Sequence, residues 1–284
     1  MTLEVISEHT AFAGKVGFYR HPSDVNQCTM QFSVFQPPQA ASGPVPVVTW
    51  LSGLTCSEET FMIKGGALRV AAELGLMLVA PDTSPRGDDV PDDPDGAYDF
   101  GLGAGFYVNA TAAPWNQHYN MYDYVTKELA EVVASEFPGN PDRQGIFGHS
   151  MGGHGALTLG LKNPDVFSSI SAFAPICSPI HCPWGQKALG NYLGSDETQW
   201  SAYDAAELAR NVGEARPVNP ILVDQGLSDQ FLEQELNPHL LEEACRVGGI
   251  DLELRRHPGY DHGYYFISTF MEDHLRHHAK YLQD

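Results

Sequence analysis

The sequence predicts an α/β fold in which helices flank a mostly parallel, doubly wound β-sheet. Short apolar runs typical of buried strands alternate along the chain with amphipathic segments of helical period. A glycine-flanked serine also stands between one such apolar run and one such helical segment. Such alternation is what a parallel sheet with right-handed crossovers requires. Because no repeat and no Ser/Gly/Pro-rich linker divides the chain, we expect residues 1–284 to form one domain.

The predicted elements follow from periodicity and from the glycines and prolines that bound each segment. Strands are expected at 30–35, 45–51, 76–81, 146–147, 169–173, 220–224 and 251–255. Helices are expected at 67–74, 119–137, directly after the serine, at 231–247 in spite of Pro238, and from 263 to about 282.

Composition excludes several classes of function. The formal net charge of −20 disfavours binding to nucleic acid or to an anionic membrane surface. No apolar stretch is long enough to cross a bilayer, and the N-terminal residues lack the basic and apolar regions of a signal peptide, so we expect a cytoplasmic protein. The five cysteines are an odd number without metal-type spacing, which predicts free thiols and neither a disulfide framework nor a zinc site.

The strongest motif is Gly148-His149-Ser150-Met151-Gly152, which lies between an apolar run and a run of small residues. This is the pattern of a nucleophile elbow, a sharp strand-to-helix turn in which larger side chains beside the serine would collide with neighbouring backbone. The turn exposes the serine hydroxyl at a helix N-terminus, where developing negative charge is favoured. Ser150 is therefore the predicted nucleophile.

A serine nucleophile needs a histidine base, and in hydrolases with this elbow the base comes last in the chain. His262 lies in a predicted loop between the last strand and the last helix, where its ring can reach the elbow. His257 is the main competitor, but it stands at a strand end before a proline. For the terminal-helix histidines a solvated face is expected: His274, His277 and His278.

The acid that orients the base should lie between the serine and the histidine. Asp224 and Asp229 both follow the strand at 220–224. Asp229 is preferred, because a glycine turn returns the chain toward the site, whereas Asp224 at the strand end could bond to local backbone. Asp261 is adjacent to His262 and would need strained geometry to reach that ring.

Acyl transfer also needs amide donors for the oxyanion. The N–H of Met151, directly after the nucleophile, is one by construction of the elbow. The second is expected from the loop after the strand at 45–51, where the amide of Leu54 is the candidate, although the segment could be an ordinary turn.

The irregular stretch 82–114 carries a group of aspartates: Asp88, Asp89, Asp92, Asp93 and Asp95. A calcium loop is rejected because the ligand spacing is incomplete and no glutamate closes a twelve-residue loop. A loop of this length in a compact domain is usually functional, and residues 101–107 near its end are expected to lie close beside the site.

Five blocks in order resemble the S-formylglutathione hydrolases of the esterase D family: 51–56 (LSGLTC), 103–111 (GAGFYVNAT), 148–156 (GHSMGGHGA), 224–232 (DQGLSDQFL) and 260–264 (YDHGY). The resemblance spans nearly the whole chain. It implies an α/β-hydrolase fold and a cytosolic, homodimeric serine thioesterase that converts S-formylglutathione to glutathione and formate in formaldehyde detoxification. It also implies side activity on short acyl esters, no metal or organic cofactor, and a triad of Ser150, Asp229 and His262.

Further site residues follow from this resemblance. Segment 179–187 is similar to the part of the family that covers the acyl side, so Trp184 would close a narrow pocket. Glutathione is anionic, and its carboxylates would need local cations, for which Lys64, Arg86 and Lys187 are the candidates. Cys56, two residues after Leu54, is a candidate regulatory thiol whose modification would obstruct the site.

Three alternatives remain. A general short-chain carboxylesterase would share every catalytic residue and differ in selectivity. An acyltransferase of the mycolyltransferase type has this fold, but such enzymes are exported. A non-enzymatic binding protein on this scaffold would be expected to lose members of the triad.

Overall fold

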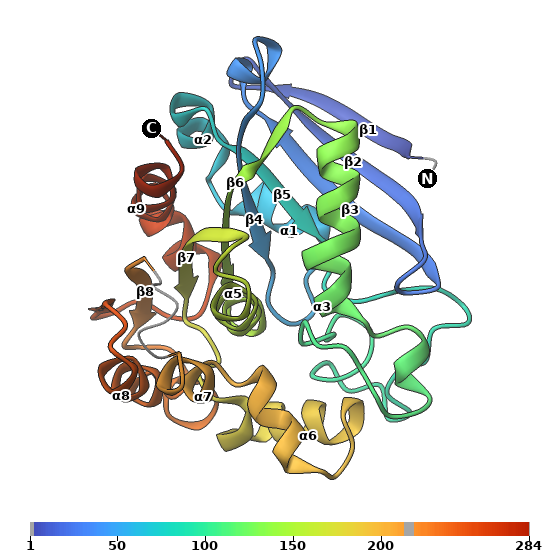
Figure 1. Ribbon diagram of the computed structural model, residues 1–284, viewed down its shortest axis with the longest axis vertical. Coiled ribbons are helices and arrows are strands. Elements are labelled where there is room, and N and C mark those ends of the chain that lie inside the picture. Colours follow the sequence, from blue (N-terminus) through green and yellow to red (C-terminus); the bar gives the residue numbers. More distant parts are fainter. Residues whose placement is uncertain (1–2, 213–218, 284) are drawn as a thin grey trace.

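The computed structural model describes residues 3–212 and 219–283, and within them the strands form a nine-stranded sheet in the order β1-β2-β3-β5-β4-β6-β7-β8-β9 (Figure 1). Neighbours from β5 to β9 run parallel, and β1, β2 and β3 join antiparallel at one edge. The predicted α/β fold with a mostly parallel sheet is confirmed. The strands are β1 (Glu4–Ala11), β2 (Gly14–Ser23), β3 (Cys28–Gln36), β4 (Val45–Leu51), β5 (Met77–Pro81), β6 (Gly139–His149), β7 (Phe167–Phe173), β8 (Ile221–Gly226) and β9 (Leu252–His257).

Helices cover both faces of the sheet (Figure 1). One face carries α3 (Met121–Asp123), α4 (Leu129–Glu136), α5 (Met151–Lys162), α7 (Ala205–Arg210) and α8 (Pro238–Gly248). The other carries α1 (Glu58–Lys64), α2 (Leu68–Leu74) and α9 (Tyr264–Leu282), while α6 (Pro183–Tyr192) packs on the short helices after β7 and β8. Short 3-10 or π-helical turns are η1 (Pro38–Ala41), η2 (Trp115–Gln117), η3 (Tyr124–Glu128), η4 (Pro179–His181), η5 (Glu197–Tyr203) and η6 (Leu232–Leu236).

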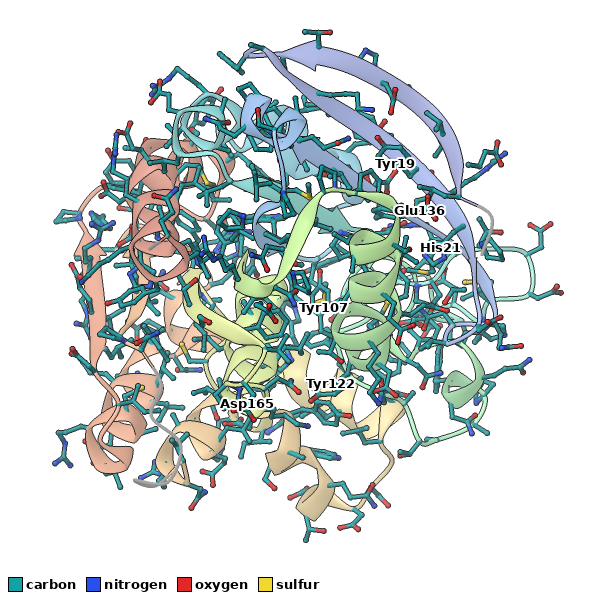
Figure 2. The ribbon with its side chains drawn as sticks, turned by 45° about the horizontal axis from the view of Figure 1, so that its top comes forward. Tyr19, His21, Tyr107, Tyr122, Glu136 and Asp165 are labelled. Carbon is teal, nitrogen blue, oxygen red and sulfur yellow. The ribbon has the colours of Figure 1, made fainter. Side chains whose placement is uncertain are left out.

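Buried aromatic side chains fill the space between sheet and helices. On β2, Tyr19 and His21 point toward the helix that ends at Glu136 (Figure 2), and His21 stacks on Tyr124 with ring centroids 5.8 Å apart. On the opposite face, Trp50 of β4 stacks on Phe61 of α1 at 4.3 Å. The preceding β4 residue, Thr49, lines a hollow beneath α4. Consecutive residues of β4 therefore contact opposite layers, as a strand covered on both faces requires.

All predicted strands are present, but β1 and β2 are additional. Most residues of β1 are exposed, so it carries no apolar stripe to reveal it. The connecting turn is Phe12-Ala13, with φ of 49° and 59°, in place of the Asn-Gly or Asp-Gly that signals a hairpin. Helices α1, α6 and α7 are likewise additional, and Trp184 lies in the first turn of α6.

The helix predicted at 231–247 is interrupted. A π-helical turn, η6, ends at Leu236; the next residue, Asn237, adopts φ 47°, and α8 starts at Pro238. Proline has no N–H and clashes with the preceding turn, but at the first position of a helix neither matters. Pro238 therefore begins a second helix and does not lie within a continuous one. The 119–137 helix is present as α3, η3 and α4.

The expectation that the α9 histidines form a solvated face is wrong. His274 and His278 are fully buried against β7, where His274 Nδ1 lies 2.8 Å from Ser171 Oγ and His278 Nδ1 lies 2.7 Å from Ser169 Oγ. His277 is half-buried, and its Nε2 lies 3.2 Å from the carbonyl oxygen of Ile170. Burial lowers the pKa of all three, so their rings are neutral structural elements at pH 7.

Asp224, at the end of β8, is the centre of a buried charge cluster. Its carboxylate accepts two hydrogen bonds of 2.6 Å from Arg255, and it lies 3.0 Å from His257 Nε2 and 3.2 Å from His274 Nε2. Burial alone would raise the pKa of Asp224, but the bonds from Arg255 and His274 hold it well below its ordinary value. The cluster joins β8, β9 and α9 beneath the loops that follow β8 and β9.

Replacing Asp224 by Asn should destabilise the protein by about 3–5 kcal/mol, since it leaves Arg255 partly buried without its main partner. The folded pKa of Asp224 lies below the unfolded value of about 3.9, so this contribution is complete above that pH and disappears as the pH falls further. The measurement is urea denaturation at pH 7 and pH 3.

The matched control is Asp273→Asn, which removes the other, half-exposed partner of Arg255 and should cost at most about 1 kcal/mol. Equal losses in the two variants, or a deficit for Asp224→Asn that does not shrink at pH 3, would contradict the assignment of Asp224 as the anchor.

Candidate active site

The strand order places a crevice at the carboxyl ends of β4 and β6. These strands are adjacent and parallel, with Leu51 paired to Gly148. The chain leaves β4 toward α1 on one face of the sheet and leaves β6 toward α5 on the other. Loops that diverge in this way open a crevice at the topological switch point, the usual position of a ligand site in open α/β sheets.

Ser150 stands in this crevice in a strained conformation. Its φ and ψ are 58° and −118°, a region that non-glycine residues avoid, and it forms the N-terminal cap of α5. The elbow is possible because backbone passes very close by. A Cβ at Gly148 would lie 2.3 Å from the carbonyl oxygen of Gly152, and a Cβ at Gly152 would lie 1.9 Å from that of Leu51. Both glycines are therefore required by space.

His262 and Asp229 form a close pair beside the serine. His262, in the loop between β9 and α9, has its Nδ1 2.5 Å from Asp229 Oδ2. Asp229 is buried, and its carboxylate also accepts bonds from the Phe231 amide at 2.9 Å and from the Gln225 side chain at 3.3 Å. A carboxylate at Nδ1 holds the ring proton there, which leaves Nε2 free to accept one.

The two competing residues form a second pair. His257 binds Asp224, and its ring stacks on Phe270 at 3.9 Å, away from the pocket that holds Ser150. Asp224 binds side chains, not the local backbone suggested by its position. Asp261 accepts a bond from the Gly263 amide at 2.9 Å, which shapes the loop that carries His262.

Ser150 and His262 open into one pocket of about 280 Å³ whose exposed surface is mostly apolar. Trp184 forms part of its wall, with its ring 4.7 Å from that of Phe231, which in turn lies 5.0 Å from His262. The Trp184 amide donates to Glu235 and so holds the start of α6 in place. The lining residues are Gly53, Leu54, Thr55, Cys56, Tyr98, His149, Ser150, Trp184, Phe231, His262 and Tyr264.

His149 and Phe231 are pocket residues that the sequence did not single out. The buried ring of His149 lies 4.4 Å from that of His262, and burial lowers the pKa of His149 well below its ordinary value. The neutral ring of His149 thus packs against the ring of His262 and helps to hold it in place. Its position directly before Ser150 is the one signal that could have indicated this role.

The loop after β4 presents an unused amide. The Cys56 amide donates to the Gly53 carbonyl at 3.3 Å, which closes a turn over residues 53–56. Within residues 3–212 and 219–283, the Leu54 N–H in this turn donates to no protein acceptor. The N–H of Met151, the first residue of α5, is likewise one that a helix leaves without an internal partner.

The basic candidates do not gather at the pocket. Lys64 is exposed at the end of α1 and does not line the pocket, although its charge acts on Cys56. Arg86 is paired with Asp82 at 2.7 Å, and Lys187 bridges Asp93 at 3.0 Å and Asp99 at 2.6 Å.

Cys56 lines the pocket and is half-buried. Burial raises the pKa of its thiol, so the reactive thiolate is scarce at neutral pH. The role of this thiol in sensitivity to reagents stays a prediction.

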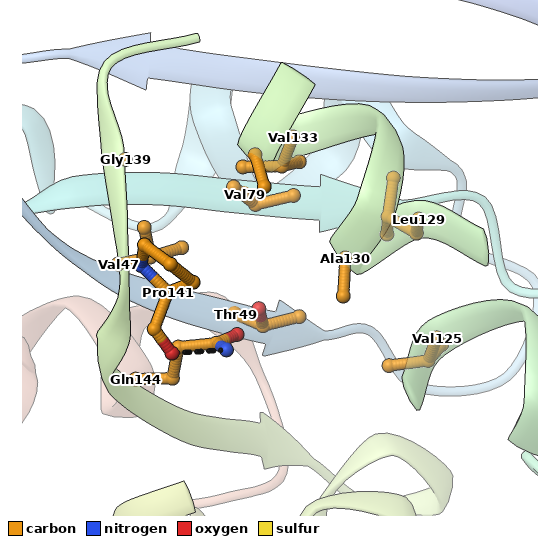
Figure 3. Close-up of a pocket in the computed structure, with 11 residues that line it drawn as sticks. Val47, Thr49, Val79, Val125, Leu129, Ala130, Val133, Gly139, Pro141 and Gln144 are labelled. Carbon is orange, nitrogen blue, oxygen red and sulfur yellow. Dashed lines mark hydrogen bonds between the residues drawn. The ribbon is translucent and has the colours of Figure 1, made fainter. Parts of the chain in front are cut away.

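A second hollow, beneath α4, is too small and too apolar to be a candidate active site. The hollow between α4 and strands β4, β5 and β6 is about 20 Å³ and is lined mainly by aliphatic side chains such as Val47, Val79 and Leu129 (Figure 3). That volume is room for about one water molecule. The described part of the chain holds no cluster of three or more His, Cys, Asp or Glu side chains suited to a metal ion. No described helix is long and apolar enough to cross a membrane.

Comparison with known proteins agrees with this geometry. Residues 23–277 match the Esterase family model. The chain is 50% identical to the S-formylglutathione hydrolases of Rattus norvegicus and Mus musculus, over 99% of each chain. The solved structure of an S-formylglutathione hydrolase from Agrobacterium tumefaciens superposes with a TM-score of 0.95 at 51% identity and covers 98% of this chain and 99% of that one. The chain therefore belongs to the S-formylglutathione hydrolase family of serine esterases.

Proposed function

We propose that this protein hydrolyses S-formylglutathione to glutathione and formate, with Ser150 as nucleophile, His262 as general base and Asp229 as the acid that orients the base. The observation that carries the proposal is the 2.5 Å contact between His262 and Asp229 at the pocket that contains the strained Ser150. The choice of S-formylglutathione as the substrate is supported by the relatives that align with nearly the whole chain and are named S-formylglutathione hydrolases.

The reaction begins when His262 Nε2 takes the Ser150 proton and the alkoxide attacks the thioester carbonyl. The amides of Leu54 and Met151 stabilise the tetrahedral oxyanion, and the dipole of α5 adds to their field. Glutathione leaves as the C–S bond breaks and its thiolate takes the proton from His262, which restores the neutral base. His262 then deprotonates a water molecule that attacks the formyl-serine ester, and it returns this proton to Ser150 as formate is released. Because a thiolate is a good leaving group, stabilisation of the oxyanion contributes more to the rate than protonation of the leaving sulfur does.

Hydrolysis of short acyl esters follows from the same residues. The apolar wall formed by Trp184 and Phe231 leaves room for a small acyl group and for an apolar leaving group. A general short-chain carboxylesterase is therefore the second candidate. The mycolyltransferase alternative is disfavoured because its long acyl chains need far more space than about 280 Å³.

The remaining expectations belong to the same proposal. Residues 1–284 act as one α/β-hydrolase domain in the cytoplasm, as a homodimer and without a metal or organic cofactor. Lys64 is the candidate cation for a glutathione carboxylate, because Arg86 and Lys187 are already paired with aspartates. Cys56, at the pocket wall, is the thiol at which a bulky adduct would block substrate.

The substrate is tested by comparing kcat/KM for S-formylglutathione with that for p-nitrophenyl acetate. We expect a preference of about 100-fold or more for the thioester, the size that several contacts to a glutathione tail can supply. A ratio near one would favour the general carboxylesterase.

The triad is tested by two variants. Ser150→Ala should lower kcat by several orders of magnitude with no change in the free energy of unfolding. Asp229→Asn should lower kcat by up to about 10⁴-fold because it presents the wrong tautomer of His262. Asp224→Asn is the control, since it should affect stability while the folded fraction keeps most of its activity. If Asp224→Asn proves the slower enzyme at equal folded fraction, the acid is wrongly assigned.

The acyl pocket is tested with a series of formyl, acetyl and butyryl thioesters. Rates should fall stepwise, since an apolar wall discriminates by about 1–3 kcal/mol per methylene. Trp184→Ala enlarges the pocket and should flatten the series. Trp200→Ala, a buried tryptophan outside the pocket, is the control and should leave the profile unchanged. An unaltered profile in Trp184→Ala would place the acyl group elsewhere.

A further inference from the structure

The oxyanion loop, residues 52–56, is held by bonds on both sides of the unused Leu54 amide. Before it, the Ser52 carbonyl accepts from the hydroxyl of Tyr107, a buried residue at the centre of the molecule, at 2.9 Å (Figure 2). After it, the Thr55 amide donates to the Gly103 carbonyl at 2.9 Å. The last anchor is the Cys56 carbonyl, which accepts from Thr83 Oγ1 and, at 3.3 Å, from Arg86 Nη2.

Asp82 organises this last anchor. Its carboxylate is almost fully buried and accepts from Arg86 Nε at 2.7 Å, from Arg86 Nη2 at 3.0 Å and from the Thr83 amide at 2.6 Å. Asp82 directly follows β5, and its own amide donates to the Gln31 carbonyl of β3 at 3.0 Å. The two side chains that hold Cys56 are therefore fixed to the sheet, independently of the loop that they hold.

Arg86 faces inward despite being partly exposed. Its Nε and Nη2 both donate hydrogen bonds to Asp82, and Nη2 also donates to the Cys56 carbonyl. Arg86 is absent from the lining of the pocket that contains Ser150. Its bonds are thus to the backbone of the oxyanion loop and not to the space where a substrate would lie.

We propose that Arg86, oriented by Asp82, is a positioning residue that sets the direction of the Leu54 amide through the Cys56 carbonyl. The inference rests on the proposed function, in which that amide binds the oxyanion. The planar guanidinium bridges carboxylate and carbonyl in one fixed geometry, which a lysine ammonium cannot reproduce. Loss of the bridge leaves the donor present but misdirected, and a misplacement of about 1 Å costs about 100-fold in rate.

The test compares Arg86→Met and Arg86→Lys with wild type. Arg86→Met leaves the buried Asp82 unpaired, so the double variant Asp82→Asn/Arg86→Met, which removes both charges, is included in case the single variant folds poorly. Arg69→Met is the matched control, because it removes an exposed arginine from another i,i+4 ion pair, with Glu73. Rates are expressed per serine labelled by a fluorophosphonate, so that unfolded protein does not count.

We expect Arg86→Met and the double variant to lose about 10- to 100-fold in kcat on S-formylglutathione and on neutral p-nitrophenyl acetate alike, with KM nearly unchanged. Affinity for a trifluoromethyl ketone, whose serine adduct carries an oxyanion, should fall by the same factor as kcat/KM. Arg86→Lys should recover little of the loss. Arg69→Met should behave as wild type.

Two results would overturn the inference. One is a raised KM for S-formylglutathione alone with kcat retained, which would make Arg86 a ligand of a glutathione carboxylate. The other is unchanged turnover per labelled serine. Failure of the proposed function is distinguishable, because wild type itself would then not hydrolyse the thioester or Ser150→Ala would remain active, and the inference would fall with it.

Discussion

The close contact of the elbow with the end of β4 is the constraint on which the arrangement of the site depends. Gly152 lies against the Leu51 carbonyl, and Gly148 lies against Gly152, so a side chain at either position would clash with the backbone and force strand and helix apart. The cost of the strained Ser150 backbone, of the order of 1–3 kcal/mol, is offset by the parallel pairing of β4, β6 and β7 around it. As a consequence, the start of α5 lies close to the loop after β4, and Ser150 and Leu54 line one pocket.

On the other side of the crevice, two Asp–His pairs share the loops after β8 and β9. Asp229 and His262 line or adjoin the pocket, whereas Asp224 and His257 lie beneath them with Arg255 and His274. The lower pair fixes the ends of the two strands from which the upper pair extends. His149 fills the space between the elbow and His262, so the position of the proposed base is determined from both the β6 and the β9 side.

Much of this site could be predicted because its signals are local. The glycine-flanked serine between an apolar run and a run of small residues indicates an elbow at Ser150, and chain order restricts the choice of base and acid. The errors arose where partners are distant in sequence. Nothing near His274 and His278 in the chain shows that Ser169 and Ser171 lie opposite them. The ion pairs of Lys187 are equally invisible, because Asp93 and Asp99 come from a much earlier, irregular segment. Asp82 and Arg86 are only four residues apart, but they lie outside any predicted helix, so their spacing gives no signal. The β1–β2 hairpin was missed because its turn uses Phe12 and Ala13.

The irregular segment that follows β5 also explains why two of the three candidate cations are not free to bind an anionic substrate. Its aspartates form ion pairs with Arg86 and Lys187. Arg86 thereby holds the loop after β4, and Lys187 ties α6 to the irregular segment. An anionic substrate then meets a mostly apolar pocket and few fixed charges. In the proposed reaction, the apolar wall lowers the local dielectric around the reacting carbonyl, so the two backbone donors act on the oxyanion more strongly than they would in bulk solvent.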